Sequence, residues 1–203
     1  MSDPTLRLDG LTGIVLAGGR GSRFGADKLA AVLGGRPLLH QAIAAVAAVA
    51  EVVIVVVAPG VEPPIPDGFA GRVRVVHDPE PFGGPLIGLA AALAGVETAT
   101  VLVVGGDMPR MVPAVLRRVA VTVGPGRPAV VLEVPGRVQP LPMALDVRAA
   151  REAAAAVLPR GGRSLRELLR ELGAASIPAA AWRSLDPAAA TIADVDRPAD
   201  LGS

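Results

Sequence analysis

Apolar residues fall into short continuous runs that alternate with longer helical segments. The run Leu11 to Ala17 stops at Gly18-Gly19, and Val52 to Val57 consists of six consecutive β-branched residues. Strands that are apolar at every position are typical of a parallel sheet covered on both faces. Pro37 to Ala50 is rich in Ala, Leu, Ile and Val and begins with a proline, which the first turn of a helix tolerates. We therefore predict a buried parallel sheet whose strands are connected by helices.

The same alternation continues toward the C-terminus. The pattern predicts strands at Val73–Val76, Thr100–Val104, Ala129–Glu133, Leu141–Leu145 and Thr191–Val195, and helices at Leu86–Gly95, Val112–Val121, Val147–Val157 and Ser164–Leu172. Buried strands that alternate with helices form right-handed βαβ units. We therefore expect an α/β three-layer sandwich with a mostly parallel, Rossmann-like sheet, in a single domain that covers residues 1–203. The segment Pro59 to Pro66 holds four prolines and is expected to be a surface loop.

Composition excludes several kinds of protein. The longest apolar stretch, Ile43 to Ala58, is interrupted by Glu51, so no membrane span is expected. The first ten residues have neither a basic segment nor an apolar one of the kind found in leader peptides, which favours a cytoplasmic location. The chain has no cysteine and two distant histidines, His40 and His77, which disfavours a zinc site. A net charge of +1, three Phe, one Trp and no Tyr disfavour nucleic acid as a partner.

Lys28 is the one lysine among the 20 basic residues, the others being arginine. Lysine and arginine are not interchangeable at phosphate sites, because the ammonium is a compact point charge and the guanidinium a planar fork. A single lysine in an arginine-rich chain therefore indicates a position where a compact cation is required.

Three polar or glycine-rich segments follow predicted strands, where ligands bind in open α/β sheets. They are Gly18–Lys28, Asp78–Gly88 and Gly105–Arg110. Glycines in the first segment allow backbone N–H groups to approach a phosphate. The segment lacks the Gly-Lys-Ser/Thr of a P-loop and the Gly-x-Gly-x-x-Gly of dinucleotide-binding proteins, which disfavours both classes.

Residues 16–28 read Leu-Ala-Gly-Gly-Arg-Gly-Ser-Arg-Phe-Gly-Ala-Asp-Lys and resemble the signature loop of the molybdenum cofactor guanylyltransferases. The resemblance continues through Gly84–Leu89, Gly106–Pro109, Gln139–Pro142, Gly162–Arg166 and Asp194–Leu201. It implies a fold of the nucleotide-diphospho-sugar transferase type. It also implies Mg²⁺-dependent transfer of GMP from GTP to the terminal phosphate of the molybdopterin cofactor, with release of pyrophosphate.

The resemblance implies a role for each residue that matches the motifs. Main-chain atoms of Leu16, Ala17, Gly18 and Gly19 would hold the base and ribose, Arg23 and Lys28 the triphosphate, Asp78 the nucleoside, and Asp107 the magnesium ion. Arg23, Lys28 and Asp107 would be the catalytic residues. The implied partners are GTP, a phosphorylated pterin acceptor and, in transient contact, other enzymes of the cofactor's pathway.

Asp196 is a candidate second magnesium ligand. It follows the predicted strand Thr191–Val195, whose carboxyl end should reach the same edge of the sheet as Asp107. The competing interpretation is that Asp196 caps a short helix that begins at Pro198.

Two alternatives stay open on the sequence alone. Guanylyltransferases of this kind can carry an asparagine near the end of the second strand, where this chain has Val56, Val57 and Ala58. A cytidylyltransferase, or another small-molecule nucleotidyltransferase on the same scaffold, is therefore the alternative enzyme. A nucleotide-binding module without catalysis is the alternative outside the enzymes.

Overall fold

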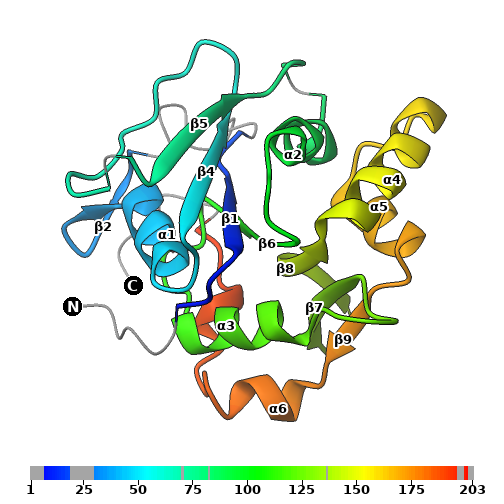
Figure 1. Ribbon diagram of the computed structural model, residues 1–203. Helices are drawn as coiled ribbons and strands as arrows, with labels where there is room; N and C mark the ends of the chain where they lie inside the picture. Colours follow the sequence, from blue (N-terminus) through cyan, green and yellow to red (C-terminus); the bar gives the residue numbers. More distant parts are fainter. Residues whose placement is uncertain are drawn as a thin grey trace.

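A seven-stranded sheet lies at the centre of the fold, with helices on both of its faces (Figure 1). The computed structural model describes residues 7–18, 30–69, 71–81, 83–135, 137–195 and 199–200. The strands are β1 (Leu11–Leu16), β2 (Val32–Leu33), β3 (Arg36–Pro37), β4 (Val52–Val57), β5 (Val73–His77), β6 (Thr100–Gly105), β7 (Ala129–Val134), β8 (Arg137–Asp146) and β9 (Ala175–Ile177). The helices are α1 (Leu38–Ala47), α2 (Pro85–Ala94), α3 (Pro113–Thr122), α4 (Val147–Val157), α5 (Leu165–Glu171) and α6 (Ala179–Arg183), with 3₁₀ turns η2 (Leu158–Arg160) and η3 (Ala190–Ile192).

The strand order in the sheet is β5-β4-β1-β6-β8-β7-β9. Only β8 pairs antiparallel with its neighbours, so six of the seven strands run in one direction. The expected mostly parallel sheet of an α/β sandwich is confirmed. Leu16 pairs with Val56 on one side and with Gly105 on the other, so β1, β4 and β6 end at the same level. The loops that leave these three strands therefore begin side by side.

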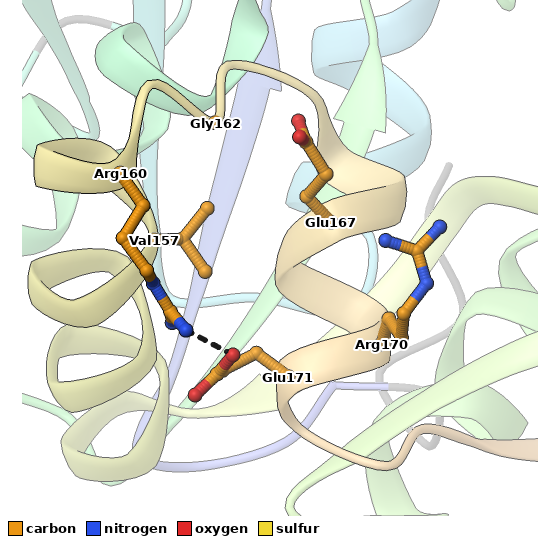
Figure 2. A pocket seen from close by; sticks show the side chains of 6 residues that line it. All are labelled: Val157, Arg160, Gly162, Glu167, Arg170 and Glu171. Atoms are coloured by element: carbon orange, nitrogen blue, oxygen red, sulfur yellow. Dashed lines mark hydrogen bonds and ion pairs between the residues drawn. The ribbon is translucent and has the colours of Figure 1, made fainter.

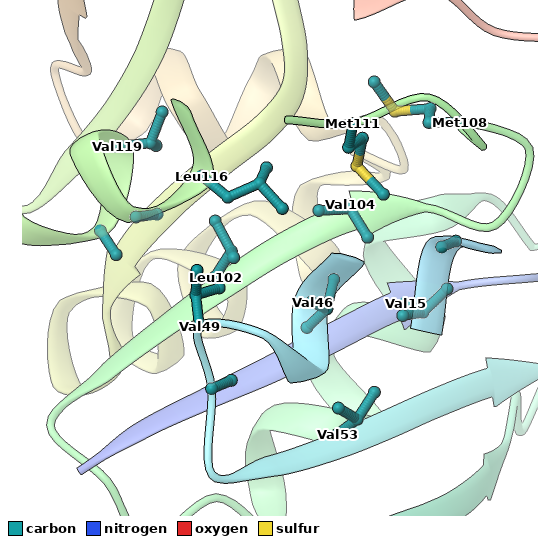
Figure 3. Close-up of a cluster of buried hydrophobic side chains, with 14 of the residues drawn as sticks. Val15, Val46, Val49, Val53, Leu102, Val104, Met108, Met111, Leu116 and Val119 are labelled. Atoms are coloured by element: carbon teal, nitrogen blue, oxygen red, sulfur yellow. The ribbon is translucent and has the colours of Figure 1, made fainter. Parts of the chain in front are cut away.

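Residues of β4 alternate between two buried apolar clusters, which explains why the strand has no polar position. Val53, Val55 and Val57 pack on the face covered by α1, α3 and α6. Ile54 and Val56 pack on the face covered by α2, α4 and α5. Figure 3 shows part of the first cluster, in which Val46, Val49, Leu116 and Val119 lie over Val15, Val53, Leu102 and Val104. Each such side chain stabilises the fold by about 1.5–3 kcal/mol when it is fully removed from water.

Several predicted elements need correction. Thr191–Val195 is not a strand, because residues 190–192 form the turn η3 and the segment after it makes no sheet pairing. The predicted strand Leu141–Leu145 is the second half of a longer strand, β8, that runs opposite to its neighbours. The hairpin β2–β3, the edge strand β9 and the helix α6 were not predicted. Each of these strands, and the helix, has five residues or fewer, so it carries little periodic signal.

Arginine side chains hold the ends of two helices. Arg72 donates to the backbone carbonyls of Ala47, Ala50 and Glu51 at the end of α1. Arg151 donates to Leu93 O at 2.6 and 3.0 Å, to Val96 O at 2.6 Å and to Ala94 O at 3.4 Å at the end of α2. Carbonyls in the last turn of a helix have no partner within it, so a guanidinium with several donors satisfies them.

Helices in the described ranges are short. The longest, α4, has 11 residues, and none of the described helices has the length and apolar character needed to cross a bilayer.

We expect Arg151→Ala to lower the free energy of unfolding by about 1–3 kcal/mol, because carbonyls at the end of α2 lose their donors. Arg148→Ala is the matched control on the same helix, since the Arg148 side chain is 85% exposed and only faces Glu152. It should change stability by no more than about 0.5 kcal/mol. Urea denaturation of the two variants measures the difference, and equal stabilities would contradict the capping role of Arg151.

Candidate active site

The first loop continues the sheet beyond the end of β1. Ala17 N donates to Val56 O at 2.7 Å, and Gly106 N donates to Leu16 O at 2.9 Å. A Cβ atom placed on Gly106 would lie 3.2 Å from the Cβ of Ala17, so the two backbones are in close contact. A Cβ on Gly18 would lie 3.4 Å from Ala58 N. Residues 16–18 are therefore held between the loops that follow β4 and β6.

Asp78 follows β5 and is half-buried beside α2. Its backbone N–H donates to Val57 O at 2.8 Å, and its Oδ1 accepts from Glu80 N at 3.0 Å. A Cβ on Gly88 would lie 3.1 Å from Asp78 Oδ2 and 2.9 Å from Val56 Cγ1. The absence of a side chain at Gly88 therefore gives the Asp78 carboxylate the space that it occupies against α2.

Asp107 follows β6 and is half-buried. Its Oδ1 lies 2.6 Å from the position that a Cβ on Gly105 would occupy, so the carboxylate folds back over the end of the strand. The carbonyl of Asp107 accepts from Val195 N at 2.9 Å. Val195 is 5% exposed and packs with Leu33 and Leu38. A segment near the C-terminus therefore lies against the Asp107 loop and the start of α1.

The segment around Arg163 meets the start of α2. Gly84, the residue before α2, has φ = 101°, a value that favours glycine, and a Cβ there would lie 2.8 Å from Arg163 O. The same carbonyl accepts from Leu86 N at 3.1 Å. It thereby satisfies one of the backbone donors that a helix start leaves without a partner. The segments Gly84–Leu89 and Gly162–Arg166, which are far apart in the sequence, therefore contact each other through Arg163 O.

A capping box fixes this segment. The Ser164 hydroxyl accepts from Glu167 N, and the Glu167 carboxylate accepts from Arg163 N and Ser164 N, both at 2.9 Å. Hydrogen bonds from the Ser164 backbone, the Ser164 side chain and the Arg163 backbone lower the pKa of Glu167 from 4.5 to about 2. Glu167 therefore stabilises the start of α5 in its ionised form.

An open pocket of about 220 Å³ lies between α4 and α5, beside Gly162 (Figure 2). It is lined by Val157, Arg160, Gly162, Glu167, Arg170 and Glu171. Arg160 and Glu171 form an ion pair across it at 2.9 Å, and Glu167 is held by the capping box. Because Arg160 is paired with Glu171 and Glu167 is engaged by the Gly162–Ser164 turn, we assign the pocket to the support of that turn.

Five of the predicted site residues lie along one edge of the sheet. Leu16 is the last residue of β1 and Ala17 and Gly18 follow it, Asp78 follows β5, and Asp107 follows β6. Gly19, Arg23, Lys28 and Asp196 lie outside the described residues. Residue patterns did not reveal the backbone contacts of Arg163 and Val195 with this edge, because main-chain atoms leave no signature in side-chain types.

Within the described residues, no group of three or more His, Cys, Asp and Glu side chains is arranged to hold a metal ion. A magnesium ion beside a triphosphate needs fewer protein ligands, since one or two carboxylates suffice and phosphate and water supply the rest. The half-buried carboxylate of Asp107 at the strand end fits that requirement.

Glycine-rich and acidic loops at the carboxyl edge of a mostly parallel sheet define the chain as an α/β nucleotidyltransferase. The model of the MobA-like NTP transferase domain matches residues 13–177, and the chain belongs to this family.

Two relatives and two solved structures illustrate the similarity. The chain is 32% identical to a probable molybdenum cofactor guanylyltransferase of Chloroflexus aggregans, over 94% of this chain and 91% of the relative. It is 38% identical to the molybdenum cofactor guanylyltransferase of Xanthomonas euvesicatoria, over 77% and 75% of the two chains.

Among solved structures, molybdopterin-guanine dinucleotide biosynthesis protein A of Archaeoglobus fulgidus matches with a TM-score of 0.75 at 21% identity, covering 94% of this chain and 95% of the other. The 2-C-methyl-D-erythritol 4-phosphate cytidylyltransferase of Thermus thermophilus matches with a TM-score of 0.69 at 23% identity and the same coverage. At these identities the two structures support the fold alone.

We expect Gly88→Ala to weaken nucleotide binding, because the new methyl group would displace the Asp78 carboxylate or Val56. Gly95→Ala, at the end of the same helix, is the matched control, since its nearest neighbour is 4.0 Å away and its φ is −97°. The measurement is the rise in melting temperature on adding GTP and Mg²⁺. If the rise is the same in both variants, Asp78 does not lie near the bound nucleotide.

A second expectation concerns acid stability. Because the folded pKa of Glu167 is about 2 and its ordinary value is 4.5, its contribution is complete above pH 4.5 and is lost as the pH falls toward 2. The difference in melting temperature between the wild type and Glu167→Gln should therefore shrink over this range. If the difference in melting temperature between the two proteins stays constant down to pH 2, the capping box does not depend on the ionised carboxylate.

Proposed function

We propose that the protein transfers GMP from GTP to the terminal phosphate of the molybdopterin cofactor, forming a guanine dinucleotide cofactor and pyrophosphate. The observation that carries the proposal is the family match over residues 13–177, which includes all three loops of the candidate site. The names of the two relatives with high coverage support the choice of substrate. We further infer a cytoplasmic enzyme that meets other enzymes of the cofactor's pathway transiently, as the names of these relatives suggest.

Each predicted residue has a role in this reaction. Main-chain groups of residues 16–19 hold the guanine and ribose, and Asp78 assists in holding the nucleoside. An oxygen of the acceptor's phosphate attacks the α-phosphorus of GTP, a new P–O bond forms, and the bond to the β-phosphate bridging oxygen breaks. Arg23 and Lys28 stabilise the negative charge that develops on the departing pyrophosphate.

Asp107, together with Asp196, would hold Mg²⁺. When bound, the ion neutralises charge on the triphosphate oxygens. The bond from Val195 N to Asp107 O supports the assignment of Asp196, because it brings the residue before Asp196 to the Asp107 backbone. Residues 191–195 do not form a strand, so this backbone contact, and not a strand end, is the observation that supports Asp196 as a ligand.

The second candidate is a cytidylyltransferase. The observation that favours it is Val56-Val57-Ala58 at the end of β4, where an asparagine can stand in guanylyltransferases, and the fold is compatible with either activity. The two candidates differ in the base and in the acceptor, and both keep the roles of Lys28 and Asp107.

The test is incubation with the molybdopterin cofactor, Mg²⁺ and GTP, CTP or ATP in turn, followed by measurement of pyrophosphate and of the dinucleotide product. We expect GTP to be preferred by about tenfold or more, because one unmatched buried polar group costs about 1–3 kcal/mol. Lys28→Ala should lose turnover with an unchanged melting temperature. Preference for CTP would establish the second candidate, and binding without pyrophosphate release would indicate a non-catalytic module.

A further inference from the structure

Asp186 is a buried carboxylate that the proposed chemistry does not use. It lies after α6 and is 3% exposed, and the buried polar residues of the described part are Thr12, Asp186 and Thr191. Burial of a carboxylate is strongly unfavourable unless hydrogen bonds compensate for lost hydration. A position of this kind therefore requires a structural or functional reason.

The Asp186 carboxylate organises the turn η3. Its Oδ1 accepts from Ala190 N at 3.1 Å and its Oδ2 from Thr191 N at 2.7 Å. Although burial alone would raise the pKa of Asp186, bonds from the Thr191 backbone and hydroxyl and from Ala190, with nearby Arg183, hold that pKa below its ordinary value. Asp186 is therefore ionised near neutral pH and accepts several hydrogen bonds from one turn.

The 3₁₀ turn η3 and the residues after it hold the loop that carries Asp107. Val112 N donates to Thr191 Oγ1 at 3.1 Å, and Val112 is the last residue before α3. Val195 N donates to Asp107 O at 2.9 Å. The connection between β6 and α3 comprises residues 106–112, so Asp107 and Val112 lie near its two ends and one C-terminal segment fixes both.

We infer that Asp186 is a positioning residue, which fixes the 190–195 segment so that Thr191 and Val195 hold the Asp107 loop in its working geometry. The inference rests on the proposed function in one respect, the role of Asp107 as a metal ligand. Catalytic and metal-binding groups need supporting contacts of this kind, because small displacements of a ligand lower affinity and rate.

The test compares Asp186→Asn and Thr191→Val with Asp146→Ala. Asp146 is the matched control, since it also caps a helix, accepting from Ala149 N at 2.8 Å, and α4 packs on the opposite face of the sheet. All three variants should melt at a lower temperature. The Asp186 and Thr191 variants should also bind Mn²⁺ in the presence of GTP several-fold more weakly, and excess Mg²⁺ should restore their turnover. The control should keep the metal affinity of the wild type.

Amide hydrogen exchange provides a readout that needs no activity. In Asp186→Asn the amides of Val112 and Val195 should exchange faster than in the wild type, and in Asp146→Ala they should be unchanged. Faster exchange with unaltered Mn²⁺ affinity would overturn the inference, because Asp186 would then serve stability alone. If the wild type fails to transfer GMP but the Asp186 and Thr191 variants bind Mn²⁺ more weakly than the wild type does, the proposed function is refuted and the positioning role of Asp186 is supported.

Discussion

The hydrogen-bonded register of β1 between β4 and β6 determines where the loops of the candidate site begin. Both faces of these strands are covered by helices, so nearly every side chain along them is apolar, and Thr12 lies near the amino end of β1, away from the candidate site. At the carboxyl end, polar groups enter where the backbone leaves the sheet. Because Leu16 pairs with both Val56 and Gly105, the loops after the three strands start at one level. The same pairing that buries the core thus collects Ala17, Gly18 and Asp107 at one edge.

The central part of the fold could be predicted because its signals are local. The six consecutive β-branched residues of Val52–Val57 predict a strand that is buried on both faces, and the structure confirms this prediction. The reversal of β8 has no local signal, since direction depends on which neighbours the strand meets. The segment Thr191–Val195 was mistaken for a strand because its apolar residues suggested burial. Thr191 and Val195 are indeed buried, but they are held by hydrogen bonds that Thr191 N donates to Asp186 and Val195 N donates to Asp107 O, and not by pairing in a sheet.

The candidate site was predictable to the extent that side-chain types and glycines mark it. Asp78, Asp107 and the residues after β1 were found from their motifs and do lie along one edge, while Gly19, Arg23, Lys28 and Asp196 stay predictions. The contacts that support the edge were not predictable. Arg163 O and Leu86 N are backbone atoms from segments far apart in the sequence. Gly88 and the Asp78 carboxylate meet because a side chain is absent at Gly88, which no side-chain type signals.

The reversed strand β8 divides the edge of the sheet into two parts of different construction. On the β1 side, chains leave parallel strands and must cross the sheet through a helix before they return. On the β7 side, β7 arrives at this edge and β8 departs from it, so the connection is a hairpin in which Val134 pairs with Arg137. A hairpin can gain, lose or exchange residues without shifting the register of β1, β4 and β6. Changes in the length of this hairpin turn are therefore compatible with an unchanged shape of the half that carries Ala17 and Asp107.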